Sequence, residues 1–199
     1  MIVQLTGKFI DLTPTRVVVD VNGVGYEAQI SLNTYSSING QESGKLYTHL
    51  RITEDAHTLF GFSTELEKEV FLKLISVSGV GSMTARMVLS SMKPNEVQET
   101  IVNGNAKQLE AVKGIGKKTA ERVILELKDK MKLTTVASDS TTSQGGAVKV
   151  QASFNEAVEA MIALGISKSV AENAVKKACG DSVTPLRTED IIKMAFRYI

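Results

Sequence analysis

The chain has 199 residues, of which 43% are hydrophobic, and a formal net charge of +1. This length allows one large domain or two to three small ones, and the apolar share is ordinary for a globular protein. The single cysteine, Cys179, excludes an internal disulfide, and two histidines argue against a zinc site. Without a signal peptide or an apolar run of 18 residues, we expect a cytoplasmic protein that needs no metal or cofactor.

Residues 1–62 predict a small β-barrel. Runs of β-branched and alternating apolar residues indicate five strands, within residues 1–10, 15–21, 24–31, 45–52 and 56–62. Asn22-Gly23 between two apolar strands is a strong hairpin signal. Five short strands in so short a segment are typical of an OB-fold. The segment carries 4 basic and 6 acidic groups and few aromatics, which argues against a simple platform for single-stranded nucleic acid.

The turn between the last two expected strands carries two adjacent carboxylates, Glu54 and Asp55. Aspartate favours turns, so composition alone indicates a solvated hairpin tip. Two carboxylates would also allow general acid–base or metal chemistry. No third carboxylate or histidine stands at a recognisable ligand spacing from them, so the residues alone favour the solvated tip.

Residues 63–133 predict an all-helical segment that contains a duplication. The stretch that begins at Val77 recurs at Val112, and the matching positions keep a constant offset of 35 residues. Each copy predicts a helix, a tight Gly-x-Gly turn and a second helix. Glycine permits a sharp turn and lets a ligand approach the backbone closely. The unpaired N–H groups and the positive dipole end of the second helix then predict an anion site, most naturally for a phosphate.

The residues expected to contact phosphate lie in and just after the two turns. They are Gly79, Val80, Gly81 and Ser82 in the first copy, and Gly114, Ile115, Gly116, Lys117 and Lys118 in the second. The helix dipole normally disfavours lysines in a first turn, so this pair indicates compensation by a bound anion. The segment also holds 12 basic against 9 acidic groups, as nucleic-acid binding requires. The alternative is that each turn only ends one helix and lets the next one pack. Neither turn has the spacing of a P-loop or a dinucleotide fingerprint.

The remainder of the chain predicts a linker and a small bundle. Residues 134–152 lack periodicity and are rich in Ser, Thr, Gly and Ala, which indicates a flexible linker. Residues 153–199 predict three short helices, with Ser153 and Glu156 as a capping box at the start of the first. A tethered bundle of this size usually binds a partner. Docking as a cap onto the rest of the chain is the alternative.

This order of elements, together with several local strings, resembles the bacterial RuvA family, which recognises Holliday junctions as part of the RuvAB complex. The strings are Gly23-Val24-Gly25-Tyr26-Glu27, Glu54-Asp55-Ala56, Leu59-Phe60-Gly61-Phe62, Gly79-Val80-Gly81, Gly114-Ile115-Gly116-Lys117-Lys118-Thr119-Ala120-Glu121-Arg122 and Ala163-Leu164-Gly165. The duplicated unit itself resembles the tandem helix-hairpin-helix motif, which binds backbone phosphates without reading bases. The resemblance spans the whole chain and is weakest in the linker.

The resemblance implies a homotetramer, with one or two tetramers on each four-way junction. Each tandem hairpin pair would hold one arm, and Glu54 and Asp55 would form an acidic pin at the centre that helps part the strands. The C-terminal bundle looks UBA-like and would contact the hexameric ATPase RuvB. The residues at the matching apolar positions are Met161, Leu164, Ile166 and Phe196, whose spacing also fits core packing. The junction resolvase RuvC is a further implied partner.

The resemblance places ATP hydrolysis in RuvB and leaves this chain without a catalytic or nucleotide site. Met83 departs from the family pattern, where a basic residue often follows the first hairpin, so the first copy is expected to grip phosphate less strongly. One alternative is a helix-hairpin-helix nuclease or glycosylase that acts on branched or damaged DNA. Glu121 is the nearest acid after the second hairpin and has no obvious catalytic partner. A protein-only adaptor is the other alternative.

Overall fold

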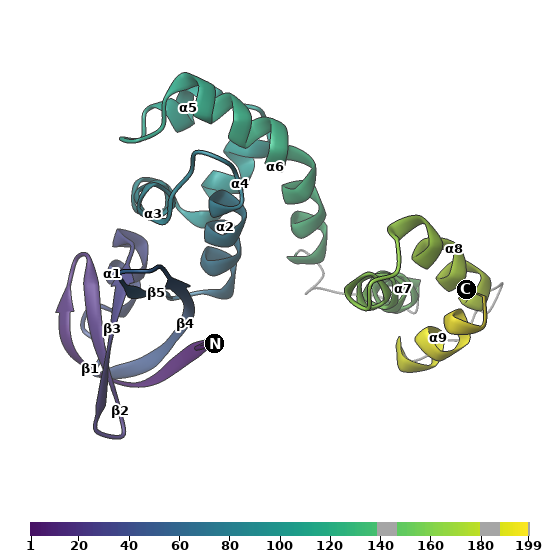
Figure 1. The fold of residues 1–199 in the computed structure, drawn as a ribbon, viewed down its shortest axis with the longest axis horizontal. Helices are drawn as coiled ribbons and strands as arrows, with labels where there is room; N and C mark the ends of the chain where they lie inside the picture. The colour runs from purple at the N-terminus through teal and green to yellow at the C-terminus, as the bar shows by residue number, and fades with distance from the viewer. Residues whose placement is uncertain (139–146, 180–187, 199) are drawn as a thin grey trace. The chain divides into compact units, whose positions relative to one another are not determined.

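The computed structural model describes residues 1–138, 147–179 and 188–198 (Figure 1). The chain forms two compact units, Met1–Ser138 and Asp139–Ile199. The first unit consists of a β-barrel followed by five helices, and the described part of the second unit is helical. None of the helices in the described ranges is both long and apolar enough to span a membrane.

Five strands form a closed barrel, which confirms the predicted OB-like fold. They are β1 (Gln4–Thr13), β2 (Arg16–Val21), β3 (Val24–Ile30), β4 (Ser43–Ile52) and β5 (His57–Phe62). The strands follow the order β1-β2-β3-β5-β4, in which β3 and β5 are parallel and the other pairs are antiparallel. Asn22 and Gly23 have φ angles of 53° and 89°, as a two-residue hairpin with a type I′ turn requires. Alternating side chains such as Val17, Val19 and Ala28 fill the interior.

A short helix, α1 (Leu32–Ile38), connects β3 with β4 and was not predicted from the sequence. Its side-chain N-cap is Ser31, which accepts a hydrogen bond from the Thr34 backbone N–H at 3.0 Å. Seven residues give too few turns for a periodic apolar pattern, so the serine cap was the main signal for this helix.

The predicted all-helical segment follows the barrel. Its helices are α2 (Glu65–Ile75), α3 (Ser82–Ser91), α4 (Pro94–Val102), α5 (Ala106–Glu110) and α6 (Lys117–Ser138). The barrel and these helices share a hydrophobic core, in which the ring of Phe71 on α2 lies 5.1 Å from Phe60 and 4.9 Å from Phe62 on β5. The predicted boundary between residues 62 and 63 therefore marks a change of secondary structure inside one compact unit.

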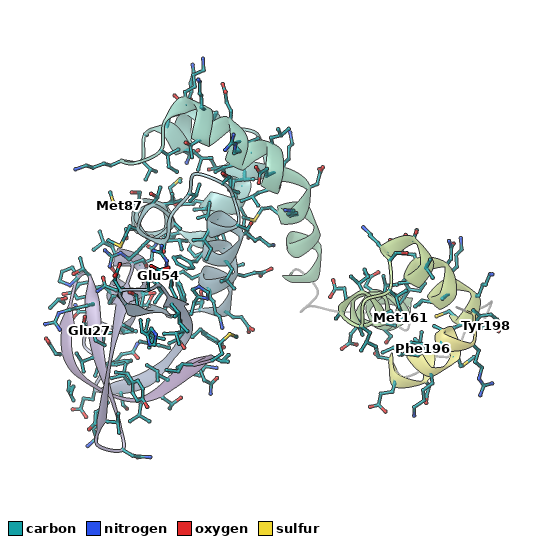
Figure 2. The ribbon with its side chains drawn as sticks, in the orientation of Figure 1. Glu27, Glu54, Met87, Met161, Phe196 and Tyr198 are labelled. Atoms are coloured by element: carbon teal, nitrogen blue, oxygen red, sulfur yellow. The ribbon has the colours of Figure 1, made fainter. Side chains whose placement is uncertain are left out.

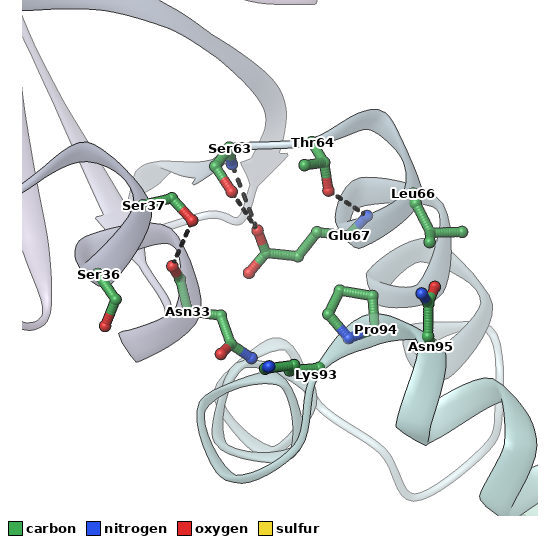
Figure 3. Close-up of a pocket in the computed structure, with 10 residues that line it drawn as sticks. All are labelled: Asn33, Ser36, Ser37, Ser63, Thr64, Leu66, Glu67, Lys93, Pro94 and Asn95. Atoms are coloured by element: carbon green, nitrogen blue, oxygen red, sulfur yellow. Dashed lines mark hydrogen bonds between the residues drawn. The ribbon is translucent and has the colours of Figure 1, made fainter.

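A buried carboxylate fixes α2 to α1. Glu67 is 1% exposed and accepts hydrogen bonds from the hydroxyls of Ser31, Thr34 and Ser63 and from the Ser63 backbone N–H. Figure 3 shows the two bonds from Ser63. The Thr64 hydroxyl in turn accepts from the Glu67 backbone N–H at 3.1 Å and caps α2. Glu67 also borders a pocket of about 390 Å³ between α1, α2 and α4. Because protein donors already engage the carboxylate, we assign this pocket to the joint between barrel and helices.

The second unit contains the three predicted helices. They are α7 (Ala147–Ala163), α8 (Lys168–Cys179) and α9 (Thr188–Ala195), and a 3₁₀ turn follows at Phe196–Tyr198. Small side chains of α8, including Ala171 and Ala174, pack against Met161 of α7 and Ile191 of α9 to form the core. The bundle has little apolar surface to bury, as expected for so short a segment.

The predicted linker at residues 134–152 is too long. Helix α6 continues through Ser138 and α7 begins at Ala147, while residues 139–146 lie outside the described part. Neither helical extension contains Gly or Pro, and each added residue extends an existing helix at little cost. Ser153 therefore lies inside α7, and the predicted capping box is wrong. Glu156 instead accepts a hydrogen bond from the Thr188 hydroxyl at 2.7 Å, which ties α7 to α9.

Candidate nucleic-acid interface

The two Gly-x-Gly turns have the same backbone geometry. Gly79 and Gly114 adopt φ angles of 92° and 96°. The hydrogen bonds also repeat at the offset of 35 residues: Val80 N to Val77 O at 3.0 Å and Ala85 N to Gly81 O at 2.9 Å in the first copy, and Ile115 N to Val112 O at 3.1 Å and Ala120 N to Gly116 O at 2.9 Å in the second. The sequence duplication is therefore a structural duplication of two helix-hairpin-helix units.

Each turn requires its two glycines for different reasons. The first, Gly79 or Gly114, has a left-handed φ that a residue with a side chain adopts only with strain. The second, Gly81 or Gly116, lies at the start of the next helix, where an added Cβ would meet no atom within 4 Å. Gly81 has φ −82° and caps α3 without a side-chain hydrogen bond. The open space and the uncapped N–H groups are what close approach of an anion needs.

The predicted phosphate-binding residues divide into exposed and buried groups. The four glycines, Lys117 and Lys118 are exposed. The side chains of Val80 and Ile115 are each 5% exposed and anchor their turns in the core, so only their backbone can face a ligand. Ser82 is also 5% exposed, and its hydroxyl accepts a hydrogen bond from Arg51 Nη1 at 2.8 Å.

The two turns lie next to each other. Arg122 on α6 donates from Nη1 to the carbonyl oxygen of Ser78 in the first turn, at 3.3 Å. A Cβ at Gly114 would lie 3.7 Å from the side chain of Thr84 on α3. Helix α6 thus contacts the first copy, and Thr84 of α3 lies close to the second turn. Arg122 also brings a cation to the first turn, a contact that the sequence reasoning did not foresee.

The first hairpin is hydrogen-bonded to the barrel. Arg86 on α3 donates to the carbonyl oxygen of Thr15 at 3.1 Å and to the Gln29 side chain. Burial of this guanidinium lowers the pKa of Arg86 from its ordinary value. Asn33 on α1 donates from Nδ2 to the carbonyl oxygens of Leu89 and Met92, the latter at 2.9 Å. These hydrogen bonds therefore fix the position of the first hairpin relative to the barrel.

The acidic residues lie at the tip of the β4–β5 hairpin. Glu54 and Asp55 are both exposed, and Thr53 closes the turn through its backbone N–H and its hydroxyl, which donate to the Ala56 carbonyl oxygen at 2.9 and 3.0 Å. Glu54 projects from the end of the barrel that faces the helices (Figure 2). Among the described residues, no group of three His, Cys, Asp or Glu side chains could hold a metal ion. The turn therefore presents two carboxylates at the end of the hydrogen-bonded β4–β5 hairpin.

The C-terminal residues predicted to contact a partner do not share one surface. Met161 is fully buried in the bundle interior (Figure 2), so we place it in the core and correct its assignment. Ile166 is partly buried and packs against the same core. Leu164 and Phe196 are 66% and 48% exposed. The helical spacing that grouped these positions could not separate core from surface.

Alanine substitutions should separate the two roles of the hairpin glycines. Gly79→Ala and Gly114→Ala force a side chain into a left-handed conformation and should lower the free energy of unfolding by about 1 kcal/mol each. Gly81→Ala and Gly116→Ala place a Cβ in open space and should cost clearly less. Urea unfolding monitored by circular dichroism measures both sets. Equal losses at the two kinds of position would contradict this division.

The comparison with known proteins agrees with the fold and the hairpin geometry. Residues 1–61 match the family model for the RuvA N terminal domain, and residues 71–129 match the SAM-like Helix-hairpin-helix tandem. Relatives named "Holliday junction branch migration complex subunit RuvA" come from Cytophaga hutchinsonii, Christiangramia forsetii and Bacteroides thetaiotaomicron. They are 46%, 45% and 44% identical over 197, 198 and 203 residues, with 99% of each chain covered. The chain belongs to the RuvA family.

Proposed function

We propose that this protein binds four-way (Holliday) DNA junctions as a non-catalytic scaffold for branch migration in recombination and repair. The observation that carries the proposal is the duplicated hairpin with an open approach to the start of each second helix, hydrogen-bonded to a barrel that carries an acidic tip. The name shared by the relatives supports the same substrate. As a DNA-binding protein it would act in the bacterial cytoplasm.

The hairpins supply affinity without reading sequence. Backbone N–H groups at the start of α3 and α6 bind phosphate oxygens, and Lys117 and Lys118 add positive charge beside the second site. Phosphates are present in every DNA, so these contacts fix position and carry no base preference. The Arg122 contact with Ser78 holds the two turns next to each other, and each pair would contact the two strands of a single duplex arm.

Selectivity for a junction then depends on assembly. Four chains around a four-fold axis would place one hairpin pair on each arm, and one or two such tetramers would bind each junction. The Glu54 and Asp55 carboxylates of the four chains would converge at the crossover and repel the phosphates there. Repulsion is screened weakly where little solvent and salt can enter, so it would help keep the strands apart.

The C-terminal bundle would bind the RuvB ATPase, which supplies the ATP hydrolysis, and the junction resolvase RuvC would act on the same complex. The exposed side chains of Leu164 and Phe196 give the bundle apolar contact area for such a partner.

A nuclease or glycosylase is the alternative among proteins with this motif. Such enzymes need a metal-binding acid cluster, or a catalytic Lys and Asp just after the hairpin. Helix α6 opens instead with Lys117 and Lys118. Membership of the RuvA family favours the scaffold over the enzyme.

The central test compares DNA affinities. Wild-type protein should bind a four-way junction at least about tenfold more tightly than linear duplex of equal length, with a steep loss of affinity as salt rises. The variant Lys117→Glu/Lys118→Glu should bind both DNAs at least about tenfold more weakly, because two positive charges next to phosphates become negative. Lys176→Glu/Lys177→Glu in α8 carries the same charge change and should bind normally. Equal affinity of the wild type for both DNAs would contradict the proposal, as would magnesium-dependent cleavage of a labelled junction.

The acidic tip should affect strand separation more than binding. Glu54→Gln/Asp55→Asn removes the repulsion and should leave junction affinity unchanged or higher while altering the rate of branch migration with RuvB. The control Glu42→Gln/Glu99→Gln neutralises two exposed carboxylates elsewhere in the first unit and should behave as wild type. Loss of junction binding by the tip variant alone would show that the pin assignment is wrong.

The partner surface can be tested on the second unit. Leu164→Ser/Phe196→Ser should weaken co-sedimentation with RuvB while junction binding is retained, because both side chains are exposed and outside the core. Val24→Ser, at an exposed position in the barrel, is the control. Unchanged RuvB binding by the double variant would remove these residues from the contact.

A further inference from the structure

The first hairpin lacks cations where the second has two. Ser82 and Met83 occupy the positions of Lys117 and Lys118 at the offset of 35 residues. Ser82 is buried, and Met83 is 54% exposed with an uncharged side chain. If the two turns contact the two strands of one arm, the first turn would bind its phosphate with less charge. The structure brings a cation to this position from another part of the chain.

Arg122 contacts Ser78 in the turn itself, and the cation beside the first residue of α3 is Arg51 on β4. Its Nη1 donates a hydrogen bond to the hydroxyl of Ser82, the first residue of α3, at 2.8 Å. Arg51 pairs with Thr58 in the β4–β5 ladder, one step before the last pair, Ile52 with His57. The position of the arginine is therefore set by the barrel, and its guanidinium lies at the end of α3 that carries the open anion site.

The guanidinium of Arg51 has more N–H donors than its hydrogen bond to Ser82 uses. An arginine carries five N–H donors, and the bond to Ser82 uses one of them. The residue is exposed, and it forms no ion pair with any carboxylate in the described parts of the chain. Arg16, on the same barrel, differs: it contacts Asp11 at 2.7 Å and Glu27 at 2.9 Å, so its charge is already balanced.

We propose that Arg51 is a phosphate-binding cation of the first hairpin, supplied by the barrel and positioned by the Ser82 hydroxyl. This inference rests on the proposed function, since it adds a residue to the same DNA interface. A phosphate at the start of α3 would receive backbone N–H groups from the helix and a planar fork of N–H groups from the arginine. The first hairpin would thus bind its strand through both α3 and the barrel, whereas the second would use the lysines of its own helix, α6.

Arg51, which would attract a phosphate, lies on the same β-hairpin as Glu54, which would repel one. Arg51 and Glu54 are three residues apart on one β-hairpin, so the ladder and its closed turn fix the separation between the positive and the negative group. A phosphate bound by Arg51 would lie at a set distance from the carboxylates that repel the next ones. The barrel would in this way define the point on the DNA backbone where phosphate binding ends and strand separation begins.

The first experiment compares Arg51→Gln with Arg16→Gln in the full-length protein, by junction binding over a series of salt concentrations. Both variants lose one positive charge. Arg51→Gln should weaken binding by about fivefold or more at low salt. The plot of log binding constant against log salt should also become less steep, by about 0.9 in slope for each Arg51 that contacts a phosphate. Arg16→Gln should match the wild type in affinity and slope.

Further variants exclude a purely structural role. Arg51→Lys keeps the charge and should retain most of the affinity, and Met83→Lys added to Arg51→Gln should restore the lost affinity and slope by placing a cation where the second hairpin has Lys118. Ser82→Ala removes the hydroxyl but not the charge, so it should cost less affinity than Arg51→Gln and leave the slope nearly unchanged.

Two results would overturn the inference: Arg51→Gln binding like Arg16→Gln, or Ser82→Ala losing as much affinity as Arg51→Gln without any change of slope. Failure of the proposed function would look different, because the wild type itself would then show no preference for the four-way junction.

Discussion

A left-handed glycine lies in the turn of each hairpin, between its two helices, and the proposed DNA interface depends on it. Gly79 and Gly114 turn the chain so that an exposed glycine, Gly81 or Gly116, lies directly before α3 or α6. The buried side chains of Val80 and Ile115 then hold each turn on the core. Without this geometry, neither the dipole of the helix nor its N–H groups would face a phosphate.

The second constraint is the joint between the barrel and the helices. The Phe71 ring cluster, the Glu67 hydrogen bonds and the Arg86 contacts all cross from one to the other, so the first hairpin and the acidic tip belong to one compact unit. A phosphate grip alone would bind any duplex. The fixed distance from that grip to Glu54 and Asp55 is what an assembly can use to distinguish a crossover from a continuous helix.

Local patterns in the sequence predicted the strands, the duplicated hairpin and the exposed lysines, because turn chemistry and a constant offset are visible without a structure. Features that depend on contacts between distant segments were not visible. Arg51 and Ser82 are 31 residues apart, and Arg122 and Ser78 are 44 apart, so no spacing rule links them. Periodicity placed Met161 on an apolar face but could not show that this face is the core. The linker was overestimated because Ser and Thr are weak evidence against helix continuation.

In the proposed function, selectivity for junctions comes from several hairpin pairs and several acidic tips at one point, so the number of chains on the DNA is the central claim. The most direct measurement is the mass of the full-length protein on a four-way junction, by light scattering or native mass spectrometry. We expect a multiple of four chains for each junction. A single chain on each junction would contradict the account, because one hairpin pair and one acidic tip could not distinguish a crossover from a duplex.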